Sequence, residues 1–334
     1  MALQLLESFN DGAFGLRLSG LNPSAVGPSY GKDGNGARLG DTSGYNFSIA
    51  VSNPCVIGFN FKVVTEPGEQ MLFTFGGTTN EYCVLFYDGT GQRLHFQFYN
   101  GAVNYQHAYS ANGSVTLGVW HFIEMRIFQN TSTASTLGWA LDGSPLTSIT
   151  NGDMPTTYGT VQFGYTTSSW VDDWYIDNLY VCDTTGGVND DLLGPIRVDD
   201  LYPNGVGTYS NMARSAGSVN YELVDENPPN DDTDYVYSTT EGDLDTYQMN
   251  DTTSADEAIA GVIANVVSRK TGGGPKFLRP LARIGGVDYT GTSGGLTESY
   301  GLVTEVWDVS PATATTWGTT EIDGMEIGQE VRDS

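Results

Sequence analysis

The acidic residues best spaced for glycoside chemistry lie in one stretch, Trp170–Cys182 (WVDDWYIDNLYVC). In an extended strand Asp173 and Asp177 share a face, but at about 3.3 Å per residue they stand about 13 Å apart. A retaining glycosidase needs its two carboxyl groups about 5–5.5 Å apart. Glu124, in the segment Val119–Phe128, has no acidic residue two positions away on either side. These spacings predict no hydrolytic carboxylate pair, and we expect a protein that is not an enzyme.

Oxygen-bearing side chains of the same stretch could bind a cation: Asp172, Asp173, Asp177 and Asn178. Calcium takes about six to eight oxygen ligands, so these residues would need further donors such as Asn10 or Asp11. The alternative, which we favour, is that Asp177 and Asn178 tie the strand to neighbouring backbone N–H groups, because buried polar groups are nearly always hydrogen-bonded. The loop at 231–234 (DDTD) is a second candidate, for which a solvated charged loop is the favoured interpretation.

Aromatic side chains could stack on sugar rings, and four are candidates: Trp170, Trp174, Tyr105 and Tyr109. Aromatic residues of a β-sandwich more often pack in its core, so a carbohydrate site stays open and unlocated. The histidines (His95, His107 and His121) lack the spacing of metal ligands, and we expect a packing role for His121. No nucleophile elbow, phosphate-binding loop or dinucleotide-binding fingerprint is present in the sequence.

The elements that must position these residues are predicted to be short β-strands. The stretch Trp170–Cys182 has the densest strand signal, with aromatic and β-branched residues and neither Gly nor Pro. Both of its faces are apolar enough to be partly covered, which suits a strand inside a sandwich. Further strands are predicted at Cys55–Val64, Gln70–Phe75, Tyr82–Tyr87, Arg93–Tyr99, Val119–Phe128, Leu137–Leu141 and Val161–Tyr165. Within Arg93–Tyr99 the residues LHFQF alternate between apolar and polar, which predicts one buried face.

Composition excludes several classes of function. The chain has 334 residues, 40 of them acidic and 14 basic, and a formal net charge of −26. This charge disfavours binding to nucleic acid or anionic membranes, because the Coulomb interaction is repulsive. The widely spaced Cys55, Cys83 and Cys182 predict buried free thiols, not a disulfide framework or zinc site. The N-terminus lacks the pattern of a secretory signal, and no segment reaches the roughly 20 apolar residues of a membrane span.

Three short motifs in the first half carry a family resemblance: Trp120–Glu124 (WHFIE), Asp142-Gly143 and Tyr175–Val181 (YIDNLYV). Through them, residues 1–183 resemble a concanavalin A-like jelly roll of the laminin G type. The resemblance implies an antiparallel sandwich, and it makes calcium a cofactor to test, since laminin G-like domains often bind calcium. Glucanases of this fold carry a Glu-x-Asp-x-Glu run on one strand, and this sequence has no such run.

A second domain is predicted at 194–334, after a linker at 184–193 that is rich in Gly and Asp. Its predicted strands are Ile196–Tyr202, Tyr235–Tyr237, Thr246–Met249 and Leu302–Trp307, with a turn at Pro203–Gly205. The segment Ala258–Arg269 has two interpretations. Ser254 and Glu257 fit a helix capping box, whereas β-branched residues and the following TGGGPK favour a strand in a hairpin with Phe277–Ile284. We favour two antiparallel strands.

The second half has a resemblance of its own, carried by residues 192–210, 217–236 and 309–328. These segments resemble a domain that follows a laminin G-like jelly roll in tailed-bacteriophage virion proteins, which are generally structural. The resemblance implies a virion protein on the particle exterior, decorating the head or lying at the tail periphery. Its partners would be other capsid or tail proteins, with host-surface glycans left open, and particle symmetry would make it a homo-oligomer. It would be made in the host cytoplasm without a signal peptide.

The sequence thus predicts an all-β chain of two tandem antiparallel β-sandwiches. The first is a concanavalin A-like jelly roll, and the second is a smaller jelly-roll-like sandwich. Two alternatives to a structural role remain open. One is a free lectin-like protein with calcium-dependent sugar binding. The other is a diverged glucan hydrolase or lyase, whose turnover would require Glu124 and Asp177.

Overall fold

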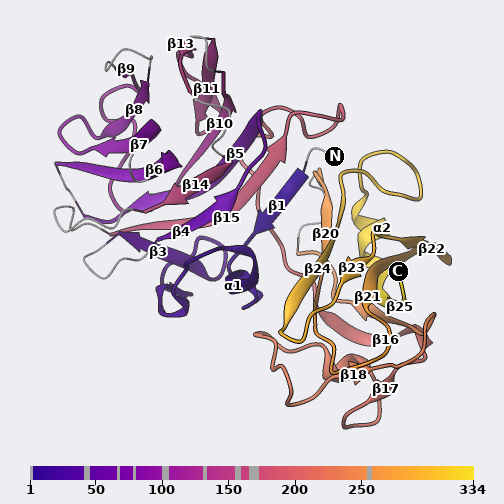
Figure 1. The fold of residues 1–334 in the computed structure, drawn as a ribbon. Coiled ribbons are helices and arrows are strands. Elements are labelled where there is room, and N and C mark those ends of the chain that lie inside the picture. Colours follow the sequence, from indigo (N-terminus) through magenta and orange to yellow (C-terminus); the bar gives the residue numbers. More distant parts are fainter. Residues whose placement is uncertain are drawn as a thin grey trace. The chain divides into compact units, whose positions relative to one another are not determined.

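The computed structural model describes residues 3–40, 46–65, 68–77, 80–99, 105–130, 134–154, 159–164, 173–253 and 258–334. These residues form antiparallel sheets with two short α-helices, α1 (Phe14–Arg17) and α2 (Thr319–Asp323) (Figure 1). The predicted fold class, an all-β chain of two sandwiches, is confirmed. In the part of the chain described, no helix is long and apolar enough to cross a membrane.

The chain divides into two compact units, and the boundary differs from the predicted one. The first unit comprises Met1–Asn10 and Arg17–Val198, and the second comprises Asp11–Leu16 and Asp199–Ser334. The predicted linker at 184–193 therefore belongs to the first unit. Two side chains of the first unit bind the end of this segment. The backbone N–H of Leu193 donates to Tyr180 Oη (3.3 Å), and that of Gly194 donates to Glu124 Oε2 (2.9 Å).

Two sheets form the first unit, and we call them sheets A and B. Sheet A contains β1 (Leu3–Glu7), β2 (Val26–Gly27), β3 (Gly36–Gly40), β5 (Cys55–Val63), β10 (His121–Phe128), β11 (Ser135–Leu141), β12 (Ser144–Pro145), β13 (Ile149–Gly152) and β15 (Asp173–Asp183). Sheet B contains β4 (Phe47–Ala50), β6 (Glu69–Gly77), β7 (Asn80–Asp88), β8 (Arg93–Tyr99), β9 (Tyr105–Tyr109) and β14 (Thr160–Phe163), in the order β4-β14-β6-β7-β8-β9. A short 3₁₀ turn covers Pro23–Ala25.

The strand β15 occupies the centre of sheet A, where it pairs with β5, β3 and β1. Figure 1 shows β5 and β15 running next to each other, with β10 on the far side of β5. Most residues of β15 are buried, and the buried residues lie on both faces of the strand, as its composition predicts. An antiparallel strand without polar alternation is stable here because both of its faces are covered.

Aromatic residues from sheets A and B meet in the core between them. Phe59 of β5 lies edge-on to Phe163 of β14, and Trp139 of β11 lies edge-on to Phe96 of β8, with ring centroids 5.2 and 4.8 Å apart. Burial of each such side chain contributes about 1.5–3 kcal/mol. The alternation predicted for Arg93–Tyr99 is confirmed, since every second residue of β8 from Leu94 onward is buried in this core.

The three cysteines of this unit are free and buried, as the sequence predicts. Burial raises the pKa of the Cys55 thiol to about 12 and raises that of Cys83 further. Both thiols therefore stay protonated and act as small apolar side chains of the core.

The second unit has one larger sheet, sheet C, and two small ones. Sheet C contains β16 (Pro203–Ser210), β19 (Leu244–Met249), β21 (Phe277–Ile284), β22 (Val287–Thr290), β23 (Gly294–Gly295) and β25 (Glu326–Arg332). The small sheets pair β17 (Ala213–Arg214) with β18 (Val236–Tyr237), and β20 (Val262–Ser268) with β24 (Gly301–Trp307). A 3₁₀ turn covers Tyr221–Leu223.

The core of the second unit lies between sheet C and the β20–β24 pair. It contains Ala264, Ala282, Ile284, Trp307, Trp317, Ile322 and Met325. The indole N–H of Trp317 donates to the backbone oxygen of Trp307 (3.0 Å), which satisfies the polar atom of a buried ring.

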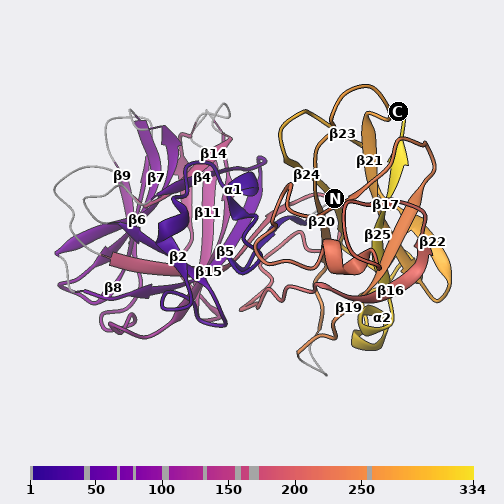
Figure 2. The ribbon, with the colours of Figure 1, turned by 90° about the horizontal axis from the view of Figure 1, so that it is seen from below.

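β25, the yellow strand that ends at C in Figure 2, pairs with both β19 and β21 and is central to sheet C.

Two regions of the second half differ from the prediction. The segment Ile196–Tyr202 is not a strand, and the turn predicted at Pro203–Gly205 is instead the start of β16. In the segment Ile196–Tyr202, backbone N–H groups donate to side chains and not to a neighbouring strand. The N–H of Val198 donates to Asn178 Oδ1 (2.7 Å), and that of Tyr202 donates to Asn250 Oδ1 (2.5 Å).

The second correction concerns strand pairing. β20 is a strand, as favoured, but its partner is β24 and not β21. β21 forms its hairpin with β22 across Gly285-Gly286, where both glycines have positive φ. That two-residue turn matches the twist of an antiparallel pair better than the TGGGPK segment does. The residues of the capping box, Ser254 and Glu257, lie outside the described part of the chain.

Candidate functional site

The residues proposed as a cation site are hydrogen-bonded to the protein itself. Asp177 sits in β15 just before a β-bulge, and its side chain is almost fully buried. Its Oδ2 accepts the backbone N–H groups of Lys32 (2.7 Å) and Asp33 (3.2 Å), and its Oδ1 accepts that of Asn178 (2.7 Å). Burial raises the pKa of Asp177, although these three donors oppose the shift.

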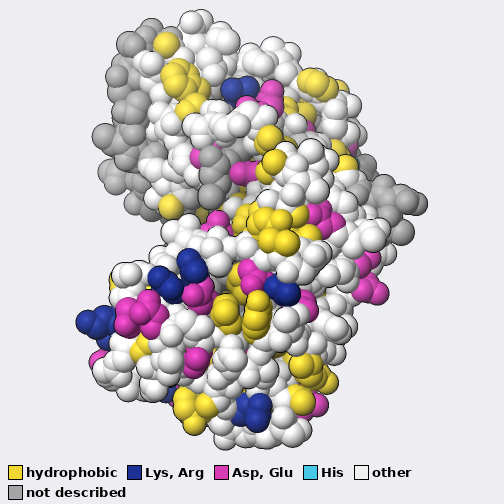
Figure 3. Space-filling model, turned by 90° about the vertical axis from the view of Figure 1, so that its right-hand side faces the viewer, with side chains coloured by type: hydrophobic (Ala, Val, Ile, Leu, Met, Phe, Trp, Pro, Cys, Tyr) yellow, Lys and Arg dark blue, Asp and Glu magenta, His cyan; other side chains and the backbone are white. Residues whose placement is uncertain are grey.

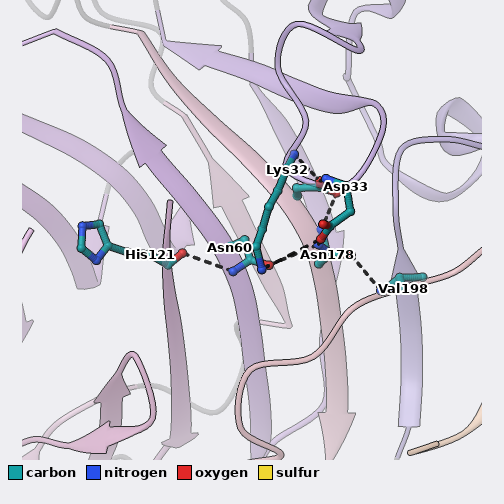
Figure 4. Close-up of polar contacts among 7 residues, drawn as sticks. Lys32, Asp33, Asn60, His121, Asn178 and Val198 are labelled. Atoms are coloured by element: carbon teal, nitrogen blue, oxygen red, sulfur yellow. Dashed lines mark hydrogen bonds and ion pairs between the residues drawn. The ribbon is translucent and has the colours of Figure 1, made fainter. Parts of the chain in front are cut away.

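Asn178 extends this network to three segments of the first unit (Figure 4). Its Nδ2 donates to Asp33 Oδ2 (3.0 Å) and to Asn60 Oδ1 (3.2 Å), while its Oδ1 accepts the backbone N–H of Val198. The residue has a positive φ of 51°, a conformation that asparagine tolerates better than most residues. The bulge at Asp177–Tyr180 thus brings two adjacent polar side chains to Asp33, and Asn178 also bonds Asn60 and Val198.

A protein cation supplies positive charge to this cluster. Lys32 Nζ lies 3.4 Å from Asn60 Oδ1 and 3.9 Å from Asp33 Oδ2 (Figure 4). Among the described residues, no group of three or more His, Cys, Asp or Glu side chains has the arrangement of a metal site. The contacts of Asp177 and Asn178 agree with the favoured interpretation, in which both side chains anchor backbone N–H groups.

The other proposed cation ligands among the described residues have protein partners of their own. Asp173 forms an ion pair with Arg38 (2.7 Å), and Asn10 accepts the backbone N–H of Asn35 (2.6 Å). Asp11 accepts the N–H of Ala13 within the second unit. Asp172 lies outside the described residues. The acidic loop at 231–234 is held by Arg269 and Tyr300, both of which donate to Asp232.

Glu124, the residue named for the enzyme alternative, has a structural position. Its Oε2 accepts the Tyr180 hydroxyl and the backbone N–H of Gly194, each at 2.9 Å. Burial and the nearby Glu124 carboxylate raise the pKa of Tyr180 far above its usual value, so the phenol stays a donor. Glu124 thereby fastens the segment after β15 to sheet A.

The four aromatic candidates separate into buried and exposed groups. Trp174 is fully buried and packs against Phe59, so it belongs to the core and offers no ring to a sugar. Trp170 lies outside the described residues. Tyr105 and Tyr109 are 40% and 44% exposed, and both lie on β9, an edge strand of sheet B.

The pairing of β8 with β9 places these tyrosines in a cluster that the sequence did not reveal. Tyr109 is opposite His95, and His107 is opposite Gln97. Because side chains alternate across a strand, these residues lie on the face of sheet B that points away from sheet A. We call this surface the outer face of sheet B. Tyr105, His107 and Tyr109 are its exposed row along β9.

A chain of hydrogen bonds crosses the outer face from β6 to β9. Glu69 Oε1 lies 2.7 Å from His95 Nδ1, and His95 Nε2 lies 2.8 Å from His107 Nδ1. The His95 ring is buried and stacks on Tyr109 with centroids 4.3 Å apart. Burial and the neighbouring His95 lower the pKa of His107, an effect that Glu69 opposes.

An arginine completes the cluster. Arg93 Cζ lies 4.1 Å from the centroid of the Tyr109 ring, and Arg93 Nε donates to Asp88 Oδ2 (2.8 Å). Slight burial opposes ionisation of Asp88, but Arg93 and the backbone N–H groups of the following turn outweigh it and lower the pKa of Asp88. The outer face therefore combines exposed rings with hydrogen-bonding groups that the fold holds in place.

The histidine cluster was missed because its members come from different strands. His95 and His107 lack metal-ligand spacing in sequence, and no short motif joins them to Glu69. The available signal was the alternation in Arg93–Tyr99 combined with a similar alternation in 105–109. Pairing those two segments in antiparallel register would have placed His95 and His107 on one face.

No protein-family model and no curated protein matches the chain. Among solved structures, an endo-β-1,4-glucuronan lyase of the fungus Trichoderma reesei is 13% identical over 54% of this chain and 90% of its own, with a TM-score of 0.36. The alginate lyase Aly36B is 14% identical over 53% and 92%, with a TM-score of 0.36. The Caenorhabditis elegans galectin LEC-6 is 9% identical over 40% and 88%, with a TM-score of 0.30. Values this low support no conclusion about ligand or activity.

Proposed function

We propose that the first unit binds a glycan on the outer face of sheet B, along β9. The observation that carries this proposal is the exposed row of Tyr105, His107 and Tyr109 at every second position of an edge strand. Successive rings of the row repeat at about 7 Å along the strand. Each ring offers an apolar surface and a polar atom, the combination that a sugar ring with its hydroxyl groups requires.

Fixed polar groups beside the row support the same function. Arg93 is held by Asp88, and His107 is held through His95 by Glu69. Such groups bind a ligand without first having to be ordered, which lowers the entropic cost of binding. Since the Asp177 and Asn178 oxygens accept hydrogen bonds from backbone N–H groups, the proposed binding does not use calcium at those residues.

We further propose that the chain is a non-enzymatic structural protein on the exterior of a tailed-phage virion. Support comes from the resemblance of residues 192–210, 217–236 and 309–328 to phage virion domains, and from a net charge of −26, which suits an exposed and soluble module. In this proposal one unit docks on capsid or tail proteins and the other faces solvent. Copies of the chain would follow the symmetry of the particle.

The glycan proposal is tested by binding of the purified chain to an oligosaccharide array, followed by calorimetry with the best ligand. We expect Tyr105→Ala to weaken binding roughly two- to tenfold, since a stacked aromatic contributes about 0.5–1.5 kcal/mol. Tyr237→Ala is the matched control, because Tyr237 is 49% exposed on β18 of the second unit. Equal affinity of Tyr105→Ala and the parent chain, with unchanged circular dichroism, would remove the row from the binding site.

The virion proposal is tested by quantitative mass spectrometry of purified particles. We expect a copy number that fits particle symmetry, high for a head decoration and low for a tail component. Complete absence from clean particles contradicts this proposal. Together with sugar binding by the isolated chain, that result would favour a free lectin-like protein.

The hydrogen-bond chain on the outer face favours one second candidate, a glycan-active enzyme. A histidine backed by a second histidine and a carboxylate is suited to proton transfer, and Tyr109 adds a phenol nearby. Polysaccharide turnover by the purified chain, lost in His107→Ala, would establish this candidate. Binding without turnover in the same assay supports the non-enzymatic role.

A further inference from the structure

We propose that His107 makes the outer face of sheet B selective for the charge of a sugar, with uncharged sugars preferred at neutral pH and carboxylate-bearing sugars gaining at acid pH. This inference rests on the proposed glycan function and names its ligand class and regulation. Three features carry it: the direction of the Glu69–His95–His107 hydrogen-bond chain, the exposure of His107, and the charges around it.

The direction of the chain follows from what each group can donate. An ionised carboxylate only accepts hydrogen bonds, so His95 Nδ1 must carry the proton that it shares with Glu69. In a neutral imidazole the other nitrogen is then an acceptor, so His95 Nε2 accepts from His107 Nδ1. His107 Nε2 is left with a lone pair. Glu69 and His95 are therefore positioning residues that fix the tautomer of His107.

The lone pair of His107 lies where a ligand can reach it. His107 is exposed in the middle of the row formed with Tyr105 and Tyr109. A sugar hydroxyl can donate a hydrogen bond to this nitrogen, but a carboxylate cannot. At neutral pH the group therefore favours the hydroxyl.

The charged and titratable groups around His107 come from four strands. Glu69 comes from β6 and Asp88 from β7, while Arg93 and His95 come from β8 and Tyr109 from β9. β13, which also packs against β9, contributes only Ile149–Gly152, none of which titrates. Arg93 and Asp88 form an ion pair, so Glu69 leaves the cluster with a negative charge that repels a carboxylate.

Protonation changes this face without breaking the chain. The next proton binds at His107 Nε2, and His107 Nδ1 still donates to His95. The ring then carries a positive charge, and Nε2 becomes a donor that a carboxylate can accept. Because burial and His95 lower the pKa of His107, the change falls below the ordinary histidine value of about 6.5.

The test is calorimetry with a matched pair of ligands, a neutral hexose tetrasaccharide and the tetrasaccharide of the corresponding uronic acid. Affinities are measured from pH 8 to pH 5 at constant ionic strength. We expect the affinity ratio of uronate to neutral sugar to rise roughly fivefold toward acid pH, the size of a partly exposed ion pair. His107→Gln should remove the rise. Glu69→Gln should move its midpoint to lower pH, because the carboxylate that favours the imidazolium is gone.

The outcomes separate this inference from the function on which it rests. If neither tetrasaccharide binds at any pH, the proposed glycan function is overturned, and the inference with it. If both bind and the ratio stays constant, only the inference is overturned. Nitrogen-15 NMR of the imidazoles without ligand checks the tautomer, and protonation at His107 Nε2 with a lone pair at Nδ1 at pH 8 would overturn the positioning role of Glu69. His121→Gln, which changes a histidine of sheet A, is the control for the calorimetry and should keep the rise in the affinity ratio.

Discussion

Single residues of the first unit fix segments that are far apart in sequence, and Asp177 is the clearest case. Its carboxylate accepts backbone N–H groups of Lys32, Asp33 and Asn178. We expect Asp177→Ala to lower the free energy of unfolding by about 2–3 kcal/mol, because buried donors lose a charged acceptor. The measurement is urea denaturation, with fluorescence as the readout.

Asp173→Ala is the matched control, because Asp173 lies on the same strand and forms a partly exposed ion pair with Arg38. That change should cost about 1 kcal/mol or less. Equal losses for the two variants would contradict the anchoring role of Asp177. A calcium-dependent rise in melting temperature that Asp177→Ala abolishes would instead make the residue a metal ligand.

A glycine opposite Tyr180 protects the contact between that tyrosine and Glu124. A Cβ placed on Gly58 would lie 2.1 Å from Tyr180 Cε1. The ring cannot move aside, because it is buried and its hydroxyl is bonded to Glu124. We expect Gly58→Ala to destabilise the protein by about 3 kcal/mol in thermal or chemical unfolding. Gly138→Ala, in β11 of the same sheet with its nearest atom at 3.8 Å, should change stability little.

At the scale of elements, strand pairing in the second unit makes a specific prediction. Val266 in β20 lies directly opposite Val303 in β24. Directly opposed Cα atoms are about 4.5–5.5 Å apart, within the range of a disulfide. We expect Val266→Cys with Val303→Cys to form an intramolecular disulfide on mild oxidation, detected by intact mass. The native thiols are buried and should not compete.

The comparison pair is Val266→Cys with Arg279→Cys, the positions that a hairpin of β20 with β21 would bring together. We expect no disulfide from this pair. Efficient cross-linking there, without cross-linking between Cys residues at 266 and 303, would restore the hairpin that the sequence favoured.

The same elements show how far sequence alone can go. The strand predicted within Trp170–Cys182, the buried face of Arg93–Tyr99 and the free thiols follow from local composition and alternation, and the structure has β15 at Asp173–Asp183, that buried face and those thiols. The partners of Asp177 could not be predicted, because Lys32 and Asp33 precede it by 145 and 144 residues. The His95–His107 contact depends on the register between β8 and β9, which neither strand encodes alone. A strand can be predicted from neighbouring residues, whereas a site or a strand pairing depends on residues that are far apart in the sequence.

At the scale of the whole molecule, the main feature is the excess of negative charge. The 40 acidic residues exceed the 14 basic ones by 26. On the face drawn in Figure 3, many dark blue side chains lie beside magenta ones. Ion pairs of this kind include Arg269–Asp232, Arg283–Asp288 and Arg38–Asp173. Many basic residues are thus paired with acidic neighbours, and the excess of acidic residues leaves a repulsion that acid should relieve.

Stability should therefore be highest at mildly acid pH. Burial raises the pKa of Asp177 in the first unit and of Asp245 in the second. A raised folded pKa means that the folded state binds the proton more tightly. That contribution is complete below the unfolded value of about 4 and is lost as pH rises through the folded pKa. The lowered pKa values of Asp88 and Glu326 act oppositely, since their stabilisation is present above about pH 4 and is lost as pH falls.

Chemical denaturation from pH 8 to pH 4 at constant ionic strength should show a maximum in the free energy of unfolding near pH 5. Stability that instead rises steadily toward pH 8 would mean that the raised pKa values of the two buried carboxyls do not govern the pH response.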